Sequence, residues 1–316
     1  MSEPATRTNL PLAAIAVFAV IAVLPLFLSD WIGFLVALAL AKGIVVLGVV
    51  LLLRGGLISF GHALYFAIGA YTVGFLVNRF GIGEALVALP LATIISTLVA
   101  TALGLLLARF RGIYFAMLSL ALSMILYTVL IKFYDFSGGT DGLSVRGFAI
   151  AGVTPADPGL AQYYLVLVVT AAVIYVGARF LASPLGYLMQ AVRYNEIRIE
   201  YLGASASQAI LASYIVSGAI SGLGGALVAY LVGHVSPELA FWVMSGDFVF
   251  VAVLGGTGSV FAPLIGSIAF EFVKNYALKF SPNTWQLTLG VFLLAVIYFQ
   301  PQGLWALFTC SRAKPR

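Results

Sequence analysis

Long apolar runs separated by short polar connectors constrain this chain more than any other feature. A membrane-spanning helix needs about 20 consecutive, mostly apolar residues, and only helices or closed barrels satisfy their backbone hydrogen bonds in lipid. The runs lack the two-residue alternation of barrel strands. We therefore expect an all-α, polytopic transmembrane bundle of about 8–10 spans with glycine-interrupted or re-entrant segments. The runs cover residues 11–28, 31–53, 57–77, 84–108, 112–134, 161–181, 207–232, 247–272 and 285–308.

The composition agrees with a membrane protein and excludes several other classes. Of the 316 residues, 62% are hydrophobic and only 9% are charged, whereas soluble domains have about 25% charged residues. The net charge of +5 does not indicate a nucleic-acid partner, because the basic residues lie between the spans, where they set topology. A single cysteine, Cys310, excludes an internal disulfide and a thiol-based metal site.

The connectors predict the domain organisation and the orientation. We expect one membrane domain over 11–308, with a polar cytoplasmic tail at 1–10 and a basic cytoplasmic tail at 309–316. The sequence LFLSDW after the first run offers no signal-peptide cleavage site, so the first span is expected to be retained. If residues 183–203 are cytoplasmic, Arg54 and the 109–111 connector are cytoplasmic too, as the positive-inside rule requires. Residues 135–160 then lie outside.

Two glycine-rich interruptions occur within the apolar runs. The sequence GGTGS at 255–259 divides the 247–272 run into two short pieces, which we expect to form half-helices or a tilted pair. The sequence RGGLISFG at 54–61 interrupts an earlier run in a similar way. Paired interruptions of this kind point to internal repeats and a site near the membrane midplane, although a simple turn explains each one alone.

Residues 183–203 have the pattern of a capped amphipathic helix. Ser183 is a favourable N-cap, Pro184 suits the first turn, and Gly203 suits the end of a helix. Two readings stay open: a helix that contacts the membrane interface or a partner, and a solvated connector. The predicted apolar face comprises Leu185, Leu188, Val192, Ile199 and Leu202, and the predicted charged face comprises Arg193, Glu196 and Glu200.

The chain contains no catalytic constellation. It has no HExxH, GxSxG or Walker A sequence, so we expect a non-enzyme, and another subunit must supply any ATP hydrolysis. Lys42 lies near the middle of a span, where a charge needs a partner or a water-filled cavity, so a structural and a substrate-path role are both open. Lys132, Glu271 and Lys274 are expected to snorkel or to pair locally. His62 is expected to hydrogen-bond a neighbouring backbone group, with a proton relay as the alternative.

Three stretches together resemble the LivM family, the inner-membrane permeases of branched-chain amino-acid ABC importers. They are GGLISFGHALYFAIGAY at 55–71, then RFRGIYFAMLSLAL at 109–122 with FSGGTDGL at 136–143, and finally the capped helix. The helix is followed by VSGAISGLGGALVAY, VSPEL at 235–239 and VLGGTGSVFAPLIGS at 253–267. The stretches occur in the family's order and cover most of the chain.

The resemblance implies a multi-pass permease of the bacterial inner membrane that works with partner proteins. These would be a second related permease, two ATP-binding-cassette ATPases that hold ATP and magnesium, and a periplasmic solute-binding protein. The chain itself would bind no cofactor. Leu57 stands where family members commonly have glutamine, and Met124 lies near a position that is often acidic, so the implied path is less polar than usual. The resemblance implies a branched-chain amino acid or a similar small polar solute as the substrate, and the two departures keep urea, other amino acids and small carboxylates open as alternatives.

The resemblance also implies two groups of functional residues. The 183–203 helix would be the segment that docks on an ATPase, through Ser183, Leu185, Gly186, Leu188, Val192, Arg193, Asn195, Glu196, Arg198, Glu200 and Gly203. Positions that line or gate the path would be Lys42, Ser59, Gly61, His62, Gly138, Gly139, Thr140, Asp141, Gly142, Gly255 and Gly256; close packing and capping are the alternative for the glycines. A competing reading from another class is an ion-coupled carrier in which Lys42, His62 and Glu271 couple the ion.

Overall fold

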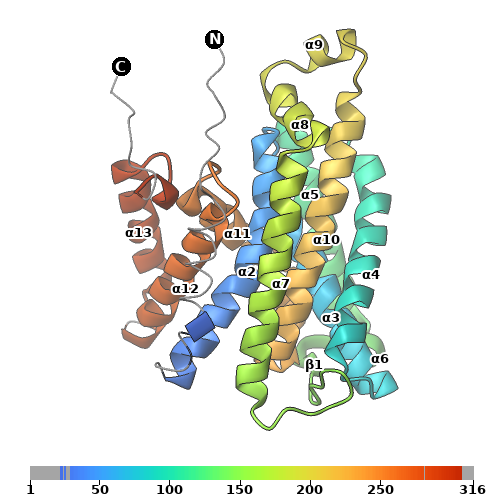
Figure 1. Ribbon diagram of the computed structural model, residues 1–316. Coiled ribbons are helices and arrows are strands. Elements are labelled where there is room, and N and C mark those ends of the chain that lie inside the picture. Colours follow the sequence, from blue (N-terminus) through green and yellow to red (C-terminus); the bar gives the residue numbers. More distant parts are fainter. Residues whose placement is uncertain (1–21, 24, 26–28, 281, 308–316) are drawn as a thin grey trace.

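The computed structural model describes residues 22, 23, 25, 29–280 and 282–307, which form a helical bundle (Figure 1). The predicted tails at 1–10 and 309–316, and most of the 11–28 run, lie outside the described residues. Within the described part, six helices are long and apolar enough to cross a membrane, and they confirm the polytopic all-α class. These are α2 (Asp30–Arg54), α3 (His62–Phe80), α4 (Ala85–Leu107), α5 (Gly112–Lys132), α7 (Pro158–Leu181) and α10 (Ala206–Val232).

Shorter elements connect and complete these spans. Two pairs of residues, β1 (Leu143–Ser144) and β2 (His234–Val235), form an antiparallel ladder. The remaining elements are α6 (Tyr134–Ser137), η2 (Gly139–Asp141), α8 (Pro184–Tyr194), α9 (Glu196–Tyr201), η3 (Pro237–Ala240), α11 (Trp242–Gly255), α12 (Ala262–Phe280), α13 (Trp285–Phe299) and η4 (Leu304–Leu307).

The bundle is built around α2 and α10. In its most apolar window α2 is 89% buried, whereas α4 and α5 are only 28% and 22% buried and lie at the periphery. Glycines bring α3 directly against α10: a Cβ added to Gly69 would lie 1.8 Å from the Gly222 carbonyl oxygen. A Cβ added to Gly225 would lie 1.9 Å from the Phe66 carbonyl oxygen. Small residues permit such backbone contact between membrane helices, so these glycines are packing positions between α3 and α10.

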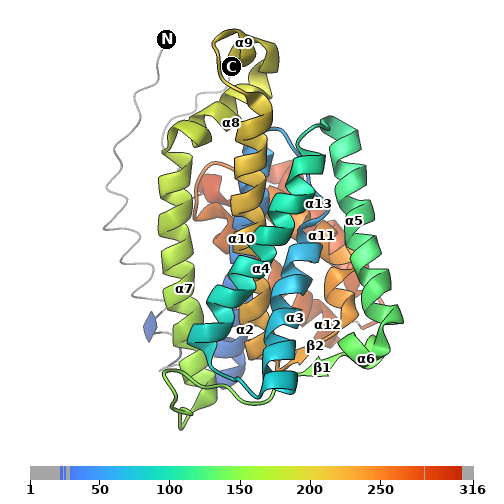
Figure 2. The same cartoon turned by 90° about the vertical axis from the view of Figure 1, so that its right-hand side faces the viewer.

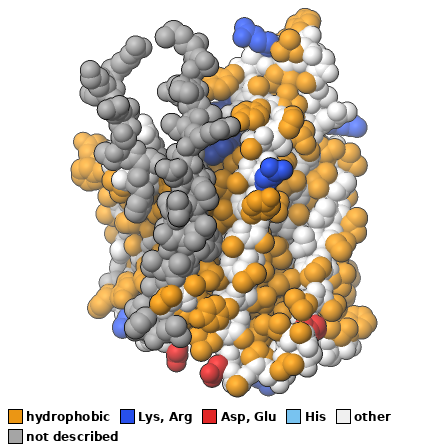
Figure 3. Space-filling model, viewed as in Figure 1, with side chains coloured by type: hydrophobic (Ala, Val, Ile, Leu, Met, Phe, Trp, Pro, Cys, Tyr) orange, Lys and Arg blue, Asp and Glu red, His pale blue; other side chains and the backbone are white. Residues whose placement is uncertain are grey.

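The bundle has two distinct ends, which Figures 1 and 2 show at the top and the bottom. At the α8–α9 end, α2 finishes at Arg54 and α10 begins at Ala206, so these two central helices run antiparallel. The β1–β2 end carries the short ladder and the loop before α7. On the face shown in Figure 3, the acidic side chains gather at the β1–β2 end and most of the basic ones lie towards the α8–α9 end.

Two irregular segments enter the bundle from opposite ends. Residues 55–61 leave the end of α2 and lead inward to α3, whose first residue, His62, is 1% exposed. Residues 233–241 leave the end of α10 and lead inward to α11, passing through η3, which contacts α3 and α5. The same order of elements thus occurs twice, in α2–α5 and again in α10–α13. Each copy has a central helix, an irregular segment, a helix that starts inside the bundle and two further helices.

This repeat corrects one expectation and confirms another. By its place in the order, the counterpart of 54–61 is 233–241, and not the glycines at 255–259. Those glycines form the turn between α11 and α12, in the place that the 81–84 turn takes between α3 and α4. The predicted division of the 247–272 run is confirmed, since α11 ends at Gly255 and α12 begins at Ala262.

Candidate functional site

The helices α3 and α11 begin next to each other inside the bundle. The backbone N–H of Ala63, in the first turn of α3, donates a hydrogen bond of 3.0 Å to the Oγ of Ser245, in the first turn of α11. Both groups are buried. Because the two irregular segments arrive from opposite ends, the N-terminal turns of the two helices meet near the centre of the bundle.

Two serines of α5 hold the two irregular segments. Ser119 Oγ accepts a 3.1 Å hydrogen bond from the backbone N–H of Phe60, in the first segment. Ser123 Oγ donates a 2.8 Å hydrogen bond to the carbonyl oxygen of Ala240, in the second segment. The two serines are one helical turn apart, and Ser123 lies near the middle of α5. One peripheral helix therefore contacts both places where the backbone is irregular.

His62 joins three helices at the same level. Its Nε2 lies 2.7 Å from the Oγ of Ser217 in α10, and that hydroxyl donates a 2.6 Å hydrogen bond to the carbonyl oxygen of Gly48 in α2. The partner of His62 is thus a hydroxyl on another helix and not the neighbouring backbone group that we expected. Ser59 Oγ accepts a 3.3 Å hydrogen bond from the N–H of Gly61. We call Ser59, His62, Ser119, Ser123, Ser217 and Ser245 the central polar cluster.

The central polar cluster has the chemistry of a site for a small polar solute. Helix N-termini present unpaired N–H groups and a partial positive charge, which favour carboxylate and other anionic groups. Hydroxyls on the facing helices donate or accept hydrogen bonds as a ligand requires. In this structure the centre is closed to solvent, because all six residues of the cluster are at most 1% exposed.

The other predicted path residues lie at three further places. Lys42 forms an ion pair with Glu271, with Nζ and Oε1 2.7 Å apart, so its charge has a structural partner. Glu271 therefore pairs across helices and not locally, and Lys274 likewise pairs with Asp247 of another helix, α11. The turn at 138–142 lies at the β1–β2 end, and the pair Gly255–Gly256 lies at the α8–α9 end. The sequence prediction had grouped all of these with Ser59, Gly61 and His62, and the structure separates them.

The 138–142 turn is shaped by its glycines. Gly138, Gly139 and Gly142 have φ between 54° and 74°, a conformation that favours glycine. A Cβ added to Gly142 would lie 2.2 Å from the carbonyl oxygen of Val235 in β2. Thr140 and Asp141 are exposed at the surface, and Asp141 Oδ2 accepts a 3.3 Å hydrogen bond from the hydroxyl of Tyr134. The turn therefore supports the ladder from which the second irregular segment starts.

Gly255 and Gly256 end α11 close to the end of α2. The Nε of Arg54 donates a 3.0 Å hydrogen bond to the carbonyl oxygen of Thr257. Gly256 has φ +90°, and a Cβ there would lie 2.5 Å from the Gln302 carbonyl oxygen. These contacts fix a turn at the α8–α9 end and do not reach the central polar cluster.

The 183–203 segment forms two helices and not one. Ser183 caps α8 as predicted, accepting a 3.3 Å hydrogen bond from the N–H of Gly186. The chain then breaks at Asn195, whose Oδ1 accepts a 3.0 Å hydrogen bond from the N–H of Arg198 and caps α9. Asparagine is a preferred N-cap, so it starts a second helix where the apolar spacing alone suggested continuation. Gly203, with φ +84°, follows the end of α9.

The predicted apolar face of this segment mostly faces the bundle. Val192 is 8% exposed and Ile199 is 5% exposed, and Leu188 packs against the same buried cluster. Val192 and Ile199 are therefore buried in this chain and Leu188 is partly buried, which corrects the prediction that Leu188 and Val192 dock on an ATPase. Gly186 is also buried, while Leu185 is 40% exposed. The large apolar side chains that do face outward are Tyr187, Tyr194, Ile197, Tyr201 and Leu202.

The α8–α9 segment rests directly on the first irregular segment. A Cβ added to Gly55 would lie 2.3 Å from the Cε of Met189, and one added to Gly56 would lie 3.3 Å from the Cγ of Arg193. Glu196 pairs with Arg111 of the α4–α5 connector at 2.6 Å. Arg198 and Glu200 are exposed. A displacement of α8 would therefore press on the backbone that leads to His62.

Sequence reasoning missed four of the six members of the central polar cluster. Ser119, Ser123, Ser217 and Ser245 are single hydroxyls in apolar runs, and the sequence analysis assigns them no role. Their signal is that a buried hydroxyl in a membrane helix needs a partner. Ser119 and Ser123 also recur one turn apart, which puts both on the same face of α5.

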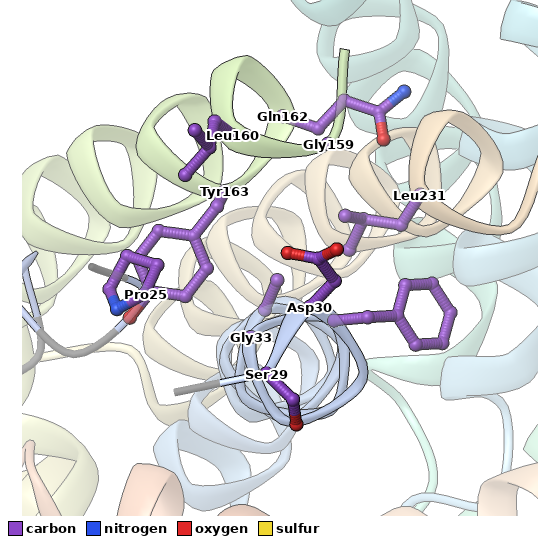
Figure 4. A pocket seen from close by; sticks show the side chains of 11 residues that line it. Pro25, Ser29, Asp30, Gly33, Gly159, Leu160, Gln162, Tyr163 and Leu231 are labelled. Carbon is purple, nitrogen blue, oxygen red and sulfur yellow. The ribbon is translucent and has the colours of Figure 1, made fainter. Parts of the chain in front are cut away.

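A separate cavity of about 100 Å³ lies at the β1–β2 end, between the ends of α2, α7 and α10 (Figure 4). Asp30 and Gly33 of α2 line it together with Leu160 of α7 and Leu231 of α10. Gln162 also lines it, and its side-chain nitrogen donates a 3.0 Å hydrogen bond to the Tyr230 carbonyl oxygen. The cavity shares no residue with the central polar cluster.

Comparison with known proteins places these features in a family. Residues 31–298 match the family described as "Branched-chain amino acid transport system / permease component". The chain is 29% identical over 272 residues to "High-affinity branched-chain amino acid transport system permease protein LivM" of Salmonella typhimurium. It is 28% identical over 272 residues to the protein of the same description from Escherichia coli. In both cases the match covers 79% of this chain and 64% of the relative.

A third relative comes from an archaeon. The chain is 25% identical over 296 residues to "Probable branched-chain amino acid transport permease protein LivM" of Methanocaldococcus jannaschii, covering 79% of this chain and 85% of that protein. No solved structure matches the chain significantly. The matched family region includes all six long apolar helices except the first residue of α2.

Proposed function

This chain belongs to the family of branched-chain amino acid transport system permease components, and we propose that it is the permease subunit of an ATP-binding-cassette importer. Its solute is a branched-chain amino acid or a similar small polar molecule. The observation that carries this proposal is the meeting of two helix N-termini, with their hydroxyl partners, at the centre of a membrane bundle. Such discontinuous helices are a recurrent way to bind a carboxylate inside a transporter.

The α8–α9 end is the cytoplasmic end in this proposal. Arg54, Arg109 and Arg111 lie in the connectors there, and so do Arg193 and Arg198, in agreement with the positive-inside rule. The localisation that follows is the inner membrane of a bacterium. The β1–β2 end then faces the periplasm, where a solute-binding protein delivers the solute.

The exposed apolar side chains of α9 and of the residues that flank it support a docking role. Tyr194 and Tyr201 are each 88% exposed, Leu202 is 80% exposed and Ile197 is 66% exposed. Exposed clusters of large apolar side chains beyond a membrane span mark protein contacts. We propose that this surface binds an ATPase that holds ATP and magnesium, and that α8 transmits the ATPase movement to Gly55 and Gly56. A second permease of related sequence and a second ATPase complete the importer.

The proposal is tested by purifying the tagged chain from its native membranes in mild detergent. We expect two ATPases with Walker A sequences and a second permease to co-purify. Reconstituted vesicles should then take up radiolabelled leucine only with ATP and the binding protein. Recovery of this chain alone, with ATP-independent uptake driven by an ion gradient, would refute the importer and favour the carrier in which Lys42 and His62 act.

A matched pair of variants tests the docking surface. Ile197 and Val153 are both 66% exposed, but they lie at opposite ends of the bundle. Ile197→Asp should reduce the amount of co-purified ATPase at least tenfold, whereas Val153→Asp should leave it unchanged. Equal ATPase recovery with both variants would show that α9 is not the docking surface.

A further inference from the structure

Four charged side chains lie together in the apolar part of the bundle. Lys42 is the thirteenth of the 25 residues of α2, and its Nζ lies 2.7 Å from the Oε1 of Glu271 in α12. One turn further along α12, the Nζ of Lys274 lies 2.8 Å from the Oδ2 of Asp247 in α11. We call these residues the four-charge network. It is electrically neutral and connects α2, α12 and the short helix α11.

The close packing of α2 against α12 does not require the charges of the four-charge network. A Cβ added to Gly43 of α2 would lie 2.7 Å from a methyl carbon of Leu264, so α2 and α12 already pack closely. Ser267 Oγ also donates a 2.6 Å hydrogen bond to the Ala39 carbonyl oxygen. Charges are costly in a membrane interior, and a buried ion pair adds little to stability compared with apolar packing. Their better-attested use is to fix one register between packed elements.

The two pairs face a common space. Lys42, Asp247, Glu271 and Ser267 all line a cavity of about 10 Å³. This volume is close to the smallest that holds a single water molecule, and the cavity wall offers donors and acceptors to it. The two ion pairs are connected through α12, which carries both Glu271 and Lys274.

Ser245 and Asp247 form contacts on opposite sides of α11. Ser245 and Asp247 are two residues apart, so their side chains leave the helix on nearly opposite sides. Ser245 faces α3 and accepts from the N–H of Ala63, while Asp247 faces α12. A rotation of α11 that breaks the Asp247 pair therefore also moves Ser245 away from Ala63.

We propose that Lys42, Asp247, Glu271 and Lys274 are positioning residues that hold α11 in the register at which Ser245 completes the central polar cluster. The part of this inference that concerns solute affinity rests on the proposed function. The part that concerns register does not depend on it. Neither pair is expected to contact the solute or to change its charge during transport.

The register is measured by disulfide formation between cysteines placed at Ala63 and Ser245. The background is Cys310→Ser, which removes the natural cysteine. In this background Asp247→Asn should slow crosslinking about tenfold or more, because it leaves Lys274 without its charge partner. The exchange D247K/K274D should restore the rate to within about threefold. As a matched control, Glu84→Gln changes a carboxylate at the β1–β2 end, which accepts hydrogen bonds from the N–H groups of Ala151 and Gly152, and should leave the rate unchanged.

The same variants without the added cysteines test solute affinity. We expect Asp247→Asn to raise the leucine concentration for half-maximal uptake about tenfold, and the exchange to reverse this. Unchanged crosslinking in Asp247→Asn would overturn the inference, and so would a crosslinking loss that the exchange does not repair. If the wild-type protein takes up neither leucine nor another small polar solute with ATP and the binding protein, but the crosslinking results hold, the proposed function fails and the register stands.

Discussion

The contact between α3 and α10 supports a sharp prediction for Gly69→Ala. The added methyl would start 1.8 Å from the Gly222 carbonyl oxygen, and 2.6 Å and 2.9 Å from the carbonyl carbon and the Cα. All three neighbours are backbone atoms, so no side-chain rotation relieves the clash. Reaching a tolerable separation of 3.0 Å from 1.8 Å requires the two helices to part by about 1.2 Å.

A separation of this size weakens the whole interface. A radial gap of about 0.5–1 Å already loses a quarter to a half of the attraction between two packed atoms. Overpacking of a core costs about 1–3 kcal/mol, and contact between two backbones puts Gly69→Ala near about 3 kcal/mol. For a chain of this size we expect the melting temperature to fall by about 6 °C or more.

Gly246→Ala provides the matched control. Gly246 also lies within a membrane-embedded helix, but an added Cβ there meets no atom within 4 Å. This variant should be neutral or more stable by about 0.5–1 kcal/mol, because alanine favours helix over glycine. Melting in detergent is followed by tryptophan fluorescence. If Gly69→Ala melts within about 1 °C of Gly246→Ala, the reasoning from backbone contact is wrong.

Three further predictions concern the site and its connection to the cytoplasmic end. Ser245→Ala leaves the buried N–H of Ala63 unpaired, so it should lower the free energy of unfolding by about 1–3 kcal/mol. It should also raise the leucine concentration for half-maximal uptake, whereas the control Ser207→Ala should have neither effect. Gly56→Ala should lower the free energy of unfolding by about 1–2 kcal/mol, because Gly56 has φ +77° and an added Cβ would lie 3.3 Å from the Cγ of Arg193. Equal melting temperatures of Gly56→Ala and wild type would contradict this. Glu196→Gln should cost less than about 1 kcal/mol, since both partners of the Arg111 pair are 32% exposed, and a double-mutant cycle with Arg111→Gln measures the coupling.

The sequence predicts the spans well because their signal is local. The apolar run at 207–232 corresponds to a helix from Ala206 to Val232, and the run at 84–108 to one from Ala85 to Leu107. The caps at Ser183 and Gly203 were also found from residue type. The break at Asn195 was missed because the apolar spacing continues across it, although asparagine followed by a helical pattern is itself an N-cap signal.

The site was harder to predict because its partners are distant in sequence. Lys42 and Glu271 are separated by 229 positions, and His62 and Ser217 by 155. No local pattern specifies which polar groups meet across helices; only the packing does. The glycine motif near His62 did identify one half of the central polar cluster, because its interruption of the apolar run is visible locally. The matching half near Ala240 has no comparable glycine cluster, so no local interruption of this kind marks it.

The position of Ser119 and Ser123 has a mechanical consequence for α5. Along the helix axis, each serine lies about 3 Å from the midpoint between the two serines. The ends of this 21-residue helix lie about 14–16 Å from the same midpoint. A tilt of about 10° around this point moves the ends by about 2.5 Å but each serine by only about 0.5 Å. Hydrogen-bond lengths in proteins normally vary over about 0.5 Å, so the hydrogen bonds of both serines would survive this smaller shift. Such a tilt of α5 would move its two ends in opposite directions, while Ser119 and Ser123 stay hydrogen-bonded to both irregular segments.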